Sequence, residues 1–162
     1  SKVDSVYRLC TDLTYKTITF SESVDFAEAV TNRLPDSVSY SSKMPVKRRR
    51  EALESFTSGN TRVINTARAL DEGFDVPGVE LAIISSGSSS PRQDVQRTGR
   101  AIRFVEGKIG YIVNLYMPDT QDEKWMKKRQ QNSTSIQHVQ SLDQAIHIMG
   151  GDIDLSHLDI TL

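Results

Sequence analysis

The stretch TRVINTARALDEGFDVP, from Thr61 to Pro77, is the most informative for the fold. In it, an apolar β-branched run is followed by small and acidic residues and then by a turn. Residues 61–65 are typical of a buried strand, since Val and Ile favour a pleated surface. Gly73 lets the backbone pass close to another group. Asp75 follows at a place fixed by Pro77, which restrains the preceding residue to an extended form. This carboxylate could accept hydrogen bonds from ribose hydroxyls or from a neighbouring arginine; alternatively, the glycine and the proline only mark a turn.

Strands and helices alternate on both sides of this stretch. We expect five strands, at residues 16–20, 37–41, 61–65, 81–85 and 110–115. We expect three helices among them, at residues 3–13, 21–32 and 45–56. The last two strands are almost continuously apolar, which is typical of strands covered on both faces. Alternation with short links predicts an α/β fold, with a parallel sheet between layers of helices.

The character of the chain changes after Pro118. The polar, basic run at residues 121–131 is expected to form a helix. Residues 132–135 are expected to form a linker and 138–149 an amphipathic helix, while the tail at 152–162 could be a strand or a docking segment. We therefore expect one domain over residues 1–162, with a core at about 14–119 and a C-terminal helical appendage at about 120–162.

A second informative segment is QRTGRAIR, from Gln96 to Arg103, which places three arginines within seven residues and contains no acidic residue. On a helix, Gln96, Arg100 and Arg103 would share one face. Like charges at this spacing repel, so the arrangement costs stability unless an anion occupies it. Guanidinium groups are suited to phosphate oxygens. The alternative interpretation is a solvated basic face with no ligand.

The bulk composition limits the classes of protein to consider. The chain has 162 residues, 25% of them charged, and no apolar run long enough to span a membrane. Its net charge is -1, so any site for a polyanion has to be a local patch. Cys10 is the only cysteine, which excludes an internal disulfide, and the three histidines lack metal-ligand spacing. The chain opens on no signal segment, so we expect a cytoplasmic protein, or a nuclear one in a eukaryote.

TARALDEGFDVP followed by SSSPRQDVQRTGRAIR resembles motifs V and VI of the superfamily two helicases and translocases. The family patterns are roughly T-A-x-x-x-x-E-G-x-D-x-P and Q-R-x-G-R-x-x-R. KTITFSES is similar to motif IV, and REALESFTSGNTRVINT resembles the usual approach to motif V. The resemblance covers about residues 16–118. It is nearer to DNA-repair and restriction-type members, which open motif VI with Gln-Arg, than to DEAD-box proteins, which open it with His-Arg.

This resemblance implies a RecA-like three-layer αβα domain with a mainly parallel sheet, acting as the second motor domain of an ATP-dependent helicase or translocase. It implies that Arg100 and Arg103 are catalytic residues that reach the γ-phosphate of ATP. It places four further residues around the nucleotide, the last of them also between the two motor domains: Gln96, Gly73, Asp75 and Arg97. It implies nucleic-acid contacts for Thr66 and Ser21.

Two family features are absent from the sequence. There is no G-x-x-x-x-G-K-[ST] loop for the β-phosphate and no Asp-Glu pair after a strand to hold Mg²⁺. We therefore expect this chain to be the second half of a motor, inactive as an ATPase alone. Its expected partners are an N-terminal RecA-like motor domain, which holds most of the ATP and Mg²⁺, and nucleic acid, DNA rather than RNA; no membrane partner is expected.

Two rival functions remain. A non-catalytic RecA-like module for interaction or nucleic-acid binding would keep the fold, but it has no need of three motif VI arginines. A nucleotide-binding oxidoreductase would want G-x-G-x-x-G after the first strand, where this chain has Ser21-Glu22-Ser23-Val24-Asp25.

Overall fold

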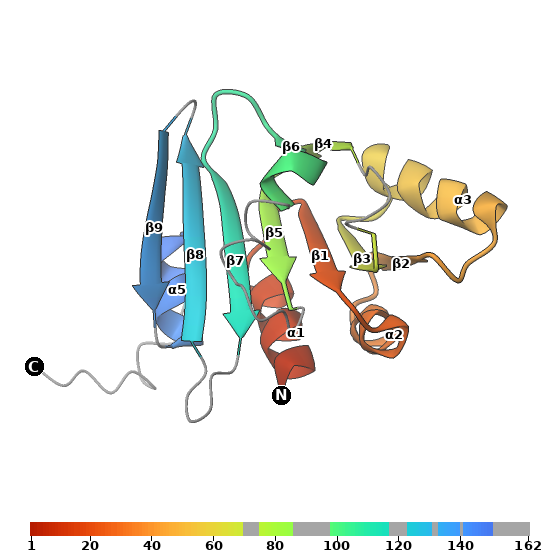
Figure 1. The fold of residues 1–162 in the computed structure, drawn as a ribbon, viewed down its shortest axis with the longest axis horizontal. Coiled ribbons are helices and arrows are strands. Elements are labelled where there is room, and N and C mark those ends of the chain that lie inside the picture. Colours follow the sequence, from red (N-terminus) through yellow and green to blue (C-terminus); the bar gives the residue numbers. More distant parts are fainter. Residues whose placement is uncertain (70–74, 86–97, 117–122, 131–132, 140, 151–162) are drawn as a thin grey trace, which may run out of the picture.

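A seven-stranded sheet runs through the molecule in the order β2-β3-β1-β5-β7-β8-β9 (Figure 1). The computed structural model describes residues 1–69, 75–85, 98–116, 123–130, 133–139 and 141–150. The first five strands in this order are parallel, and β8 and β9 are antiparallel additions. The expected parallel sheet is thus confirmed. The strands are β1 Thr17–Ser21, β2 Ser37–Ser41, β3 Val63–Ala67, β5 Leu81–Ile84, β7 Gly110–Tyr116, β8 Glu123–Gln130 and β9 Ser133–Val139.

Helices cover both faces of this sheet. One core joins α1, α2 and α5 to one face, and a second core joins α3 to the other. Among the described helices, none combines the length and the apolar character that a bilayer span needs. The helices are α1 Lys2–Asp12, α2 Val24–Arg33, α3 Val46–Thr57 and α5 Leu142–Ile148.

The two cores follow from the alternation of side chains along the strands. On β5, Leu81 and Ile83 point into the core under α1, whereas Ala82 and Ile84 point into the core under α3. Successive side chains of a strand lie on opposite faces, so a strand that is apolar throughout has to be covered twice. All four side chains are fully buried. The expected three-layer αβα architecture is therefore confirmed.

The helix α2 is capped by Ser23. Ser23 Oγ accepts a hydrogen bond from the backbone N–H of Phe26 at 3.2 Å, which satisfies one of the free donors in the first turn. Ser21 remains in β1, so the helix begins later than the sequence indicated. This places Glu22 and Ser23 in the short link between the strand and the helix.

The C-terminal region differs from its prediction. The expected helix at 121–131 is wrong, because Glu123–Gln130 forms β8, which pairs antiparallel with β7. The expected linker at 132–135 is also wrong from Ser133 on, where β9 begins. Helix propensity is a weak prior. Here, pairing with the otherwise open edge of β7 satisfies a row of backbone groups and overrides it.

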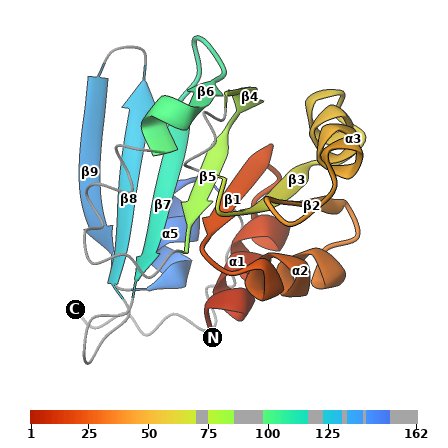
Figure 2. The same ribbon diagram turned by 45° about the vertical axis from the view of Figure 1, so that its right-hand side comes forward.

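One helix remains of the expected helical appendage. The second expected helix survives only as α5, which Ser141 caps through a hydrogen bond from the N–H of Gln144 at 3.1 Å. It is tied to the main body because Tyr15 Oη donates to the Met149 carbonyl. Figure 2 shows the β8–β9 hairpin at one edge of the molecule and α3 at the opposite edge. The tail at 152–162 lies outside the described residues.

A second, two-stranded sheet completes the fold. Its strands, β4 Val76–Val79 and β6 Ile102–Phe104, run parallel with Val76 opposite Ile102. Both of these side chains are buried in the core under α3. Figures 1 and 2 show β4 and β6 at one end of the main sheet, whereas the link from β1 into α2 lies at the other end.

Candidate functional site

The small β4–β6 sheet brings motif V and motif VI together. Asp75 immediately precedes β4, and Arg103 is the middle residue of β6. Arg103 Nε donates to Asp75 Oδ1 at 2.9 Å across 28 positions of sequence. The side chains of Arg103 and Asp75 are 65% and 64% exposed. Of the two partners considered for the Asp75 carboxylate, the structure thus contains the neighbouring arginine.

The arginine segment is not one continuous helix, and in this respect the expectation is wrong. Residues 98–101 form a helical turn that carries Arg100, but Ile102–Phe104 is extended, so Arg103 lies on a strand. The change occurs where Ile102, a β-branched residue, pairs with β4 and enters the core. Gln96 and Arg97 lie outside the described residues, as does Gly73.

Arg100 and Arg103 differ in how they are held. Both are exposed. Arg103 is paired with Asp75, whereas Arg100 makes no ion pair or hydrogen bond within the described part of the chain. Two exposed guanidinium groups three residues apart form a cationic surface that suits phosphate oxygens.

Thr66 and Ser21 lie side by side at the carboxyl ends of β3 and β1, where Phe20 is opposite Thr66. Thr66 is fully buried, and its hydroxyl donates to the Thr19 carbonyl at 2.6 Å. Ser21 is 7% exposed, and its hydroxyl lies 3.0 Å from the Ser23 carbonyl and 3.3 Å from that of Thr66. Both hydroxyls are therefore engaged inside the protein, and the nucleic-acid roles of these two residues stay predictions.

Two cations that the sequence had not singled out lie just beyond these buried hydroxyls. A hollow of about 220 Å³ opens there, between the start of α2, Lys43 and Arg68. Arg68 is exposed, and its Nε donates to the Glu22 carbonyl at 3.1 Å. Its φ of 59° is left-handed, which is uncommon outside glycine. Arg68 escaped prediction because it occupies an unspecified position of the motif V pattern.

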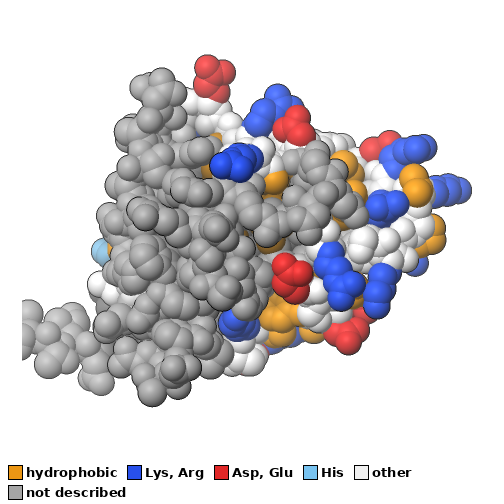
Figure 3. Space-filling model, viewed as in Figure 1, with side chains coloured by type: hydrophobic (Ala, Val, Ile, Leu, Met, Phe, Trp, Pro, Cys, Tyr) orange, Lys and Arg blue, Asp and Glu red, His pale blue; other side chains and the backbone are white. Residues whose placement is uncertain are grey.

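The hollow itself is of mixed charge, since Glu22 and Asp25 also line it. The surplus of positive charge lies on α3, whose first turn contains no acidic residue and which has no side-chain cap. Figure 3 shows Lys and Arg side chains gathered over this part of the surface. The exposed cations Lys47, Arg48 and Arg50 make no ion pair within the described residues. They stand beside Val46, which is 60% exposed.

The described residues offer cations for an anion but no cluster of metal ligands. Arg100 and Arg103 supply the cations that phosphate oxygens need, but no group of three or more His, Cys, Asp or Glu side chains in the described part could hold a metal ion. The only thiol is no substitute nucleophile, because burial raises the pKa of Cys10 to about 12 and keeps it protonated. What the described side chains offer to an anion is therefore the pair of exposed guanidinium groups.

Comparison with known sequences identifies a family for most of this chain. The model of the helicase conserved C-terminal domain matches residues 1–105. A protein assigned as the DNA 3′-5′ helicase Rad25 of Haloarcula marismortui is 35% identical over 104 residues, which are 63% of this chain and 17% of that protein. The DNA 3′-5′ translocase XPB2 of Sulfurisphaera tokodaii is 35% identical over 83 residues, 51% of this chain and 19% of that protein. The chain thus spans less than a fifth of the length of these relatives.

Comparison with solved structures agrees on the fold. The helicase domain of Hef from Pyrococcus furiosus superposes with a TM-score of 0.52 at 21% identity, over 74% of this chain and 26% of that one. The two domains therefore share the same arrangement of strands and helices. The chain belongs to the family of helicase conserved C-terminal domains, and its family uses ATP and Mg²⁺.

Proposed function

We propose that this chain works as the second motor domain of an ATP-dependent DNA helicase or translocase. In this proposal, an N-terminal RecA-like domain holds the nucleotide and Mg²⁺, and this chain completes the site from the opposite side of the cleft. The observation that carries the proposal is the exposed motif VI pair, Arg100 and Arg103, joined to motif V through Asp75.

The chemistry of these arginines follows from their exposure and their donors. Negative charge on the oxygens of the transferred phosphoryl group is stabilised by positioned guanidinium groups. In the described structure, none of the N–H donors of Arg100 is engaged, so all of them are available to phosphate oxygens. Arg103 uses Nε for Asp75, which leaves its terminal nitrogens to bind phosphate oxygens. Mg²⁺ held by the partner domain would neutralise the remaining negative charge of the phosphates.

Nucleic acid would bind at the other end of the sheet in this proposal. The hollow at the start of α2 offers Arg68 and Lys43, and α3 adds an exposed basic turn. These cations could follow the phosphates of one strand. We propose DNA rather than RNA because the two relatives described above are assigned as a DNA helicase and a DNA translocase. We keep Ser21 and Thr66 in this region of the proposal beneath the surface that binds the strand, because Thr66 is fully buried and both hydroxyls are engaged.

The decisive test is Arg100→Ala in the full-length protein that carries this domain. Loss of such an arginine is expected to lower kcat for ATP hydrolysis by roughly a thousandfold. ATP affinity should fall much less, because the partner domain holds most of the nucleotide. Nucleic-acid-stimulated hydrolysis and nucleotide binding would be measured for both proteins.

A matched control is Arg33→Ala, which removes an exposed arginine of α2, a helix on the face of the sheet opposite to the core that contains β6. It should leave kcat unchanged. Near-normal ATPase activity in Arg100→Ala would exclude the proposed role, and would favour a RecA-like module that binds partners without catalysis.

A further inference from the structure

The pairing of Asp75 with Arg103 suggests a role for the carboxylate that differs from contact with the ribose. We infer that Asp75 is a positioning residue, which orients the Arg103 guanidinium toward the phosphate before ATP enters the cleft. The inference rests on the proposed function, because it takes Arg103 as a phosphate-binding arginine. It assigns Asp75 to the arginine rather than to the nucleotide.

The positions of Asp75 and Arg103 are fixed by the paired backbone of β4 and β6. Val76 and Ile102 are paired across β4 and β6, and their side chains are 1% and 2% exposed in the core under α3. Asp75 precedes the first of these residues and Arg103 follows the second. The two exposed side chains therefore project from a buried, paired piece of backbone, so their separation is set by the fold.

The contact leaves the working end of the arginine free. An arginine has five N–H donors, and the hydrogen bond in the described structure uses Nε alone. The two terminal nitrogens remain available for phosphate oxygens in the planar geometry that a guanidinium offers. The carboxylate thus holds the side chain without occupying the atoms that would bind the phosphate.

Stability does not explain the pair, because ion pairs this exposed contribute little to folding. Preorganisation does explain it. A free arginine side chain loses much conformational entropy when a ligand fixes it. If the side chain is already held by an ion pair, the entropy that it loses on binding the phosphate is smaller. Arg100, which is unpaired in the described structure, lacks this device. The two arginines should therefore respond differently to the loss of Asp75.

A double-mutant cycle in the full-length protein tests the inference. Asp75→Asn is expected to lower kcat for ATP about tenfold, since a small misplacement of a catalytic group is costly, with KM changed less than about twofold. The same change should have no further effect in an Arg103→Ala background, because the two residues act as one unit. In an Arg100→Ala background it should keep its full effect. Asp75→Glu should recover most of the activity.

Asp4→Asn is the matched control, because it breaks a similarly exposed carboxylate–arginine pair, with Arg33, away from motif VI. It should leave kcat and KM unchanged. Thermal unfolding of each variant separates loss of function from loss of fold, and Asp75 is exposed enough for its variants to fold.

Two results would overturn the inference while leaving the proposed function intact. In the first, Asp75→Asn raises KM with kcat unchanged and discriminates less between ATP and 2′,3′-dideoxy-ATP, which assigns the carboxylate to the ribose. In the second, the loss of activity is undiminished in Arg103→Ala. By contrast, normal ATPase activity in the single variant Arg103→Ala would contradict the proposed function itself.

Discussion

Arg62 shows how much of this fold depends on a single side chain. It lies just before β3, and its guanidinium donates to the carbonyls of Cys10, Leu13 and Tyr15 at 2.7, 3.0 and 3.1 Å. Its Nε also donates to Asp36 Oδ2 at 2.9 Å. The first of these carbonyls belongs to the last turn of α1, where a cation also interacts favourably with the helix dipole. One residue therefore ties the end of α1 to the start of the central strands.

We predict that Arg62→Ala destabilises the chain by about 2 kcal/mol or more, because several partly buried carbonyls lose their donor at once. Arg62→Lys should recover little of this, since the single nitrogen of an ammonium cannot reach all four acceptors that three separate guanidinium nitrogens contact. Urea denaturation of the purified chain measures the free energy of unfolding. Arg100→Ala, which removes an exposed and unpaired arginine, is the control and should be neutral. Equal stability of the Arg62 variants and the control would contradict this account.

Thr66 and Arg103 mark the limit of prediction at the residue scale. The motif identified both residues, but not their surroundings. Thr66 is covered because β3 is an inner strand of a sheet with helices over both faces, a fact of tertiary arrangement rather than of local sequence. Arg103 meets Asp75 because β4 and β6 pair, and the apolar spacing of residues 95–103 fits a helix equally well.

At the scale of elements, the parallel strands were predictable and the C-terminal hairpin was not. The five parallel strands carry continuous apolar runs or β-branched residues, and each is separated from the next by a turn signal. Residues 123–130 carry mostly Lys, Glu and Gln, which favour a helix when considered alone. Their state depends on the free edge of β7, which becomes apparent only when the sheet is assembled.

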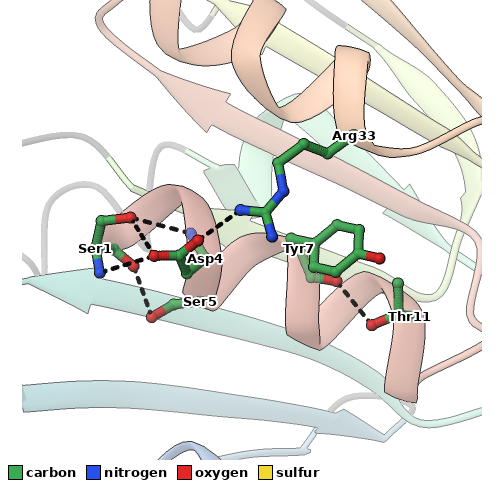
Figure 4. A network of polar contacts seen from close by, with 6 residues as sticks. All are labelled: Ser1, Asp4, Ser5, Tyr7, Thr11 and Arg33. Carbon is green, nitrogen blue, oxygen red and sulfur yellow. Dashed lines mark hydrogen bonds and ion pairs between the residues drawn. The ribbon is translucent and has the colours of Figure 1, made fainter.

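The contact between α1 and α2 is an element-scale feature with a measurable pH dependence (Figure 4). Asp4, in the first turn of α1, accepts hydrogen bonds from Ser1 Oγ at 2.8 Å and from Arg33 of α2 at 2.5 Å. The same Arg33 guanidinium lies 4.2 Å from the centre of the Tyr7 ring. Chiefly through the hydrogen bond from Ser1 and then that from Arg33, the pKa of Asp4 is lowered from 3.8 to about 2.

We predict that Asp4 stabilises the chain above about pH 4 and that this contribution fades toward pH 2. The sign follows because the unfolded chain binds the proton at the higher pKa, so acid favours unfolding. The difference in unfolding free energy between the natural chain and Asp4→Asn should therefore shrink as the pH falls from 5 toward 2. Urea titrations at several pH values would measure it. A difference that stays constant over this range would show that the carboxylate is not ionised preferentially in the folded state.

At the scale of the whole molecule, the two proposed sites lie at opposite ends of the sheet. Glu80, just after β4, donates its N–H to the Lys16 carbonyl at 2.9 Å, which places the small sheet where β1 begins. The hollow with Arg68 opens where β1 ends. Ligands of α/β sheets are expected at the carboxyl ends of strands, and the hollow obeys that rule. Variants at the nucleic-acid end should therefore leave ATP binding unchanged.

This separation leads to a prediction for the basic turn of α3. The net charge of the chain is -1, so binding of nucleic acid has to depend on local cations such as Arg48 and Arg50. Each phosphate contact that is lost should reduce the dependence of log K on log salt by about one. We expect Arg48→Ala and Arg50→Ala to weaken binding of a single-stranded oligonucleotide and to flatten its salt dependence. Fluorescence anisotropy at several salt concentrations measures both quantities.

Lys108→Ala supplies the matched control for this last prediction, because it removes an exposed cation from the turn after β6, beside the other end of the sheet. Its loss changes the net charge equally but removes no proposed phosphate contact. If charge alone governed binding, all three variants would weaken it alike. If α3 contacts the strand, only the α3 variants should lose both affinity and salt dependence. Comparing DNA and RNA oligonucleotides of the same sequence in this assay would also test the preference for DNA, since both present the same phosphates.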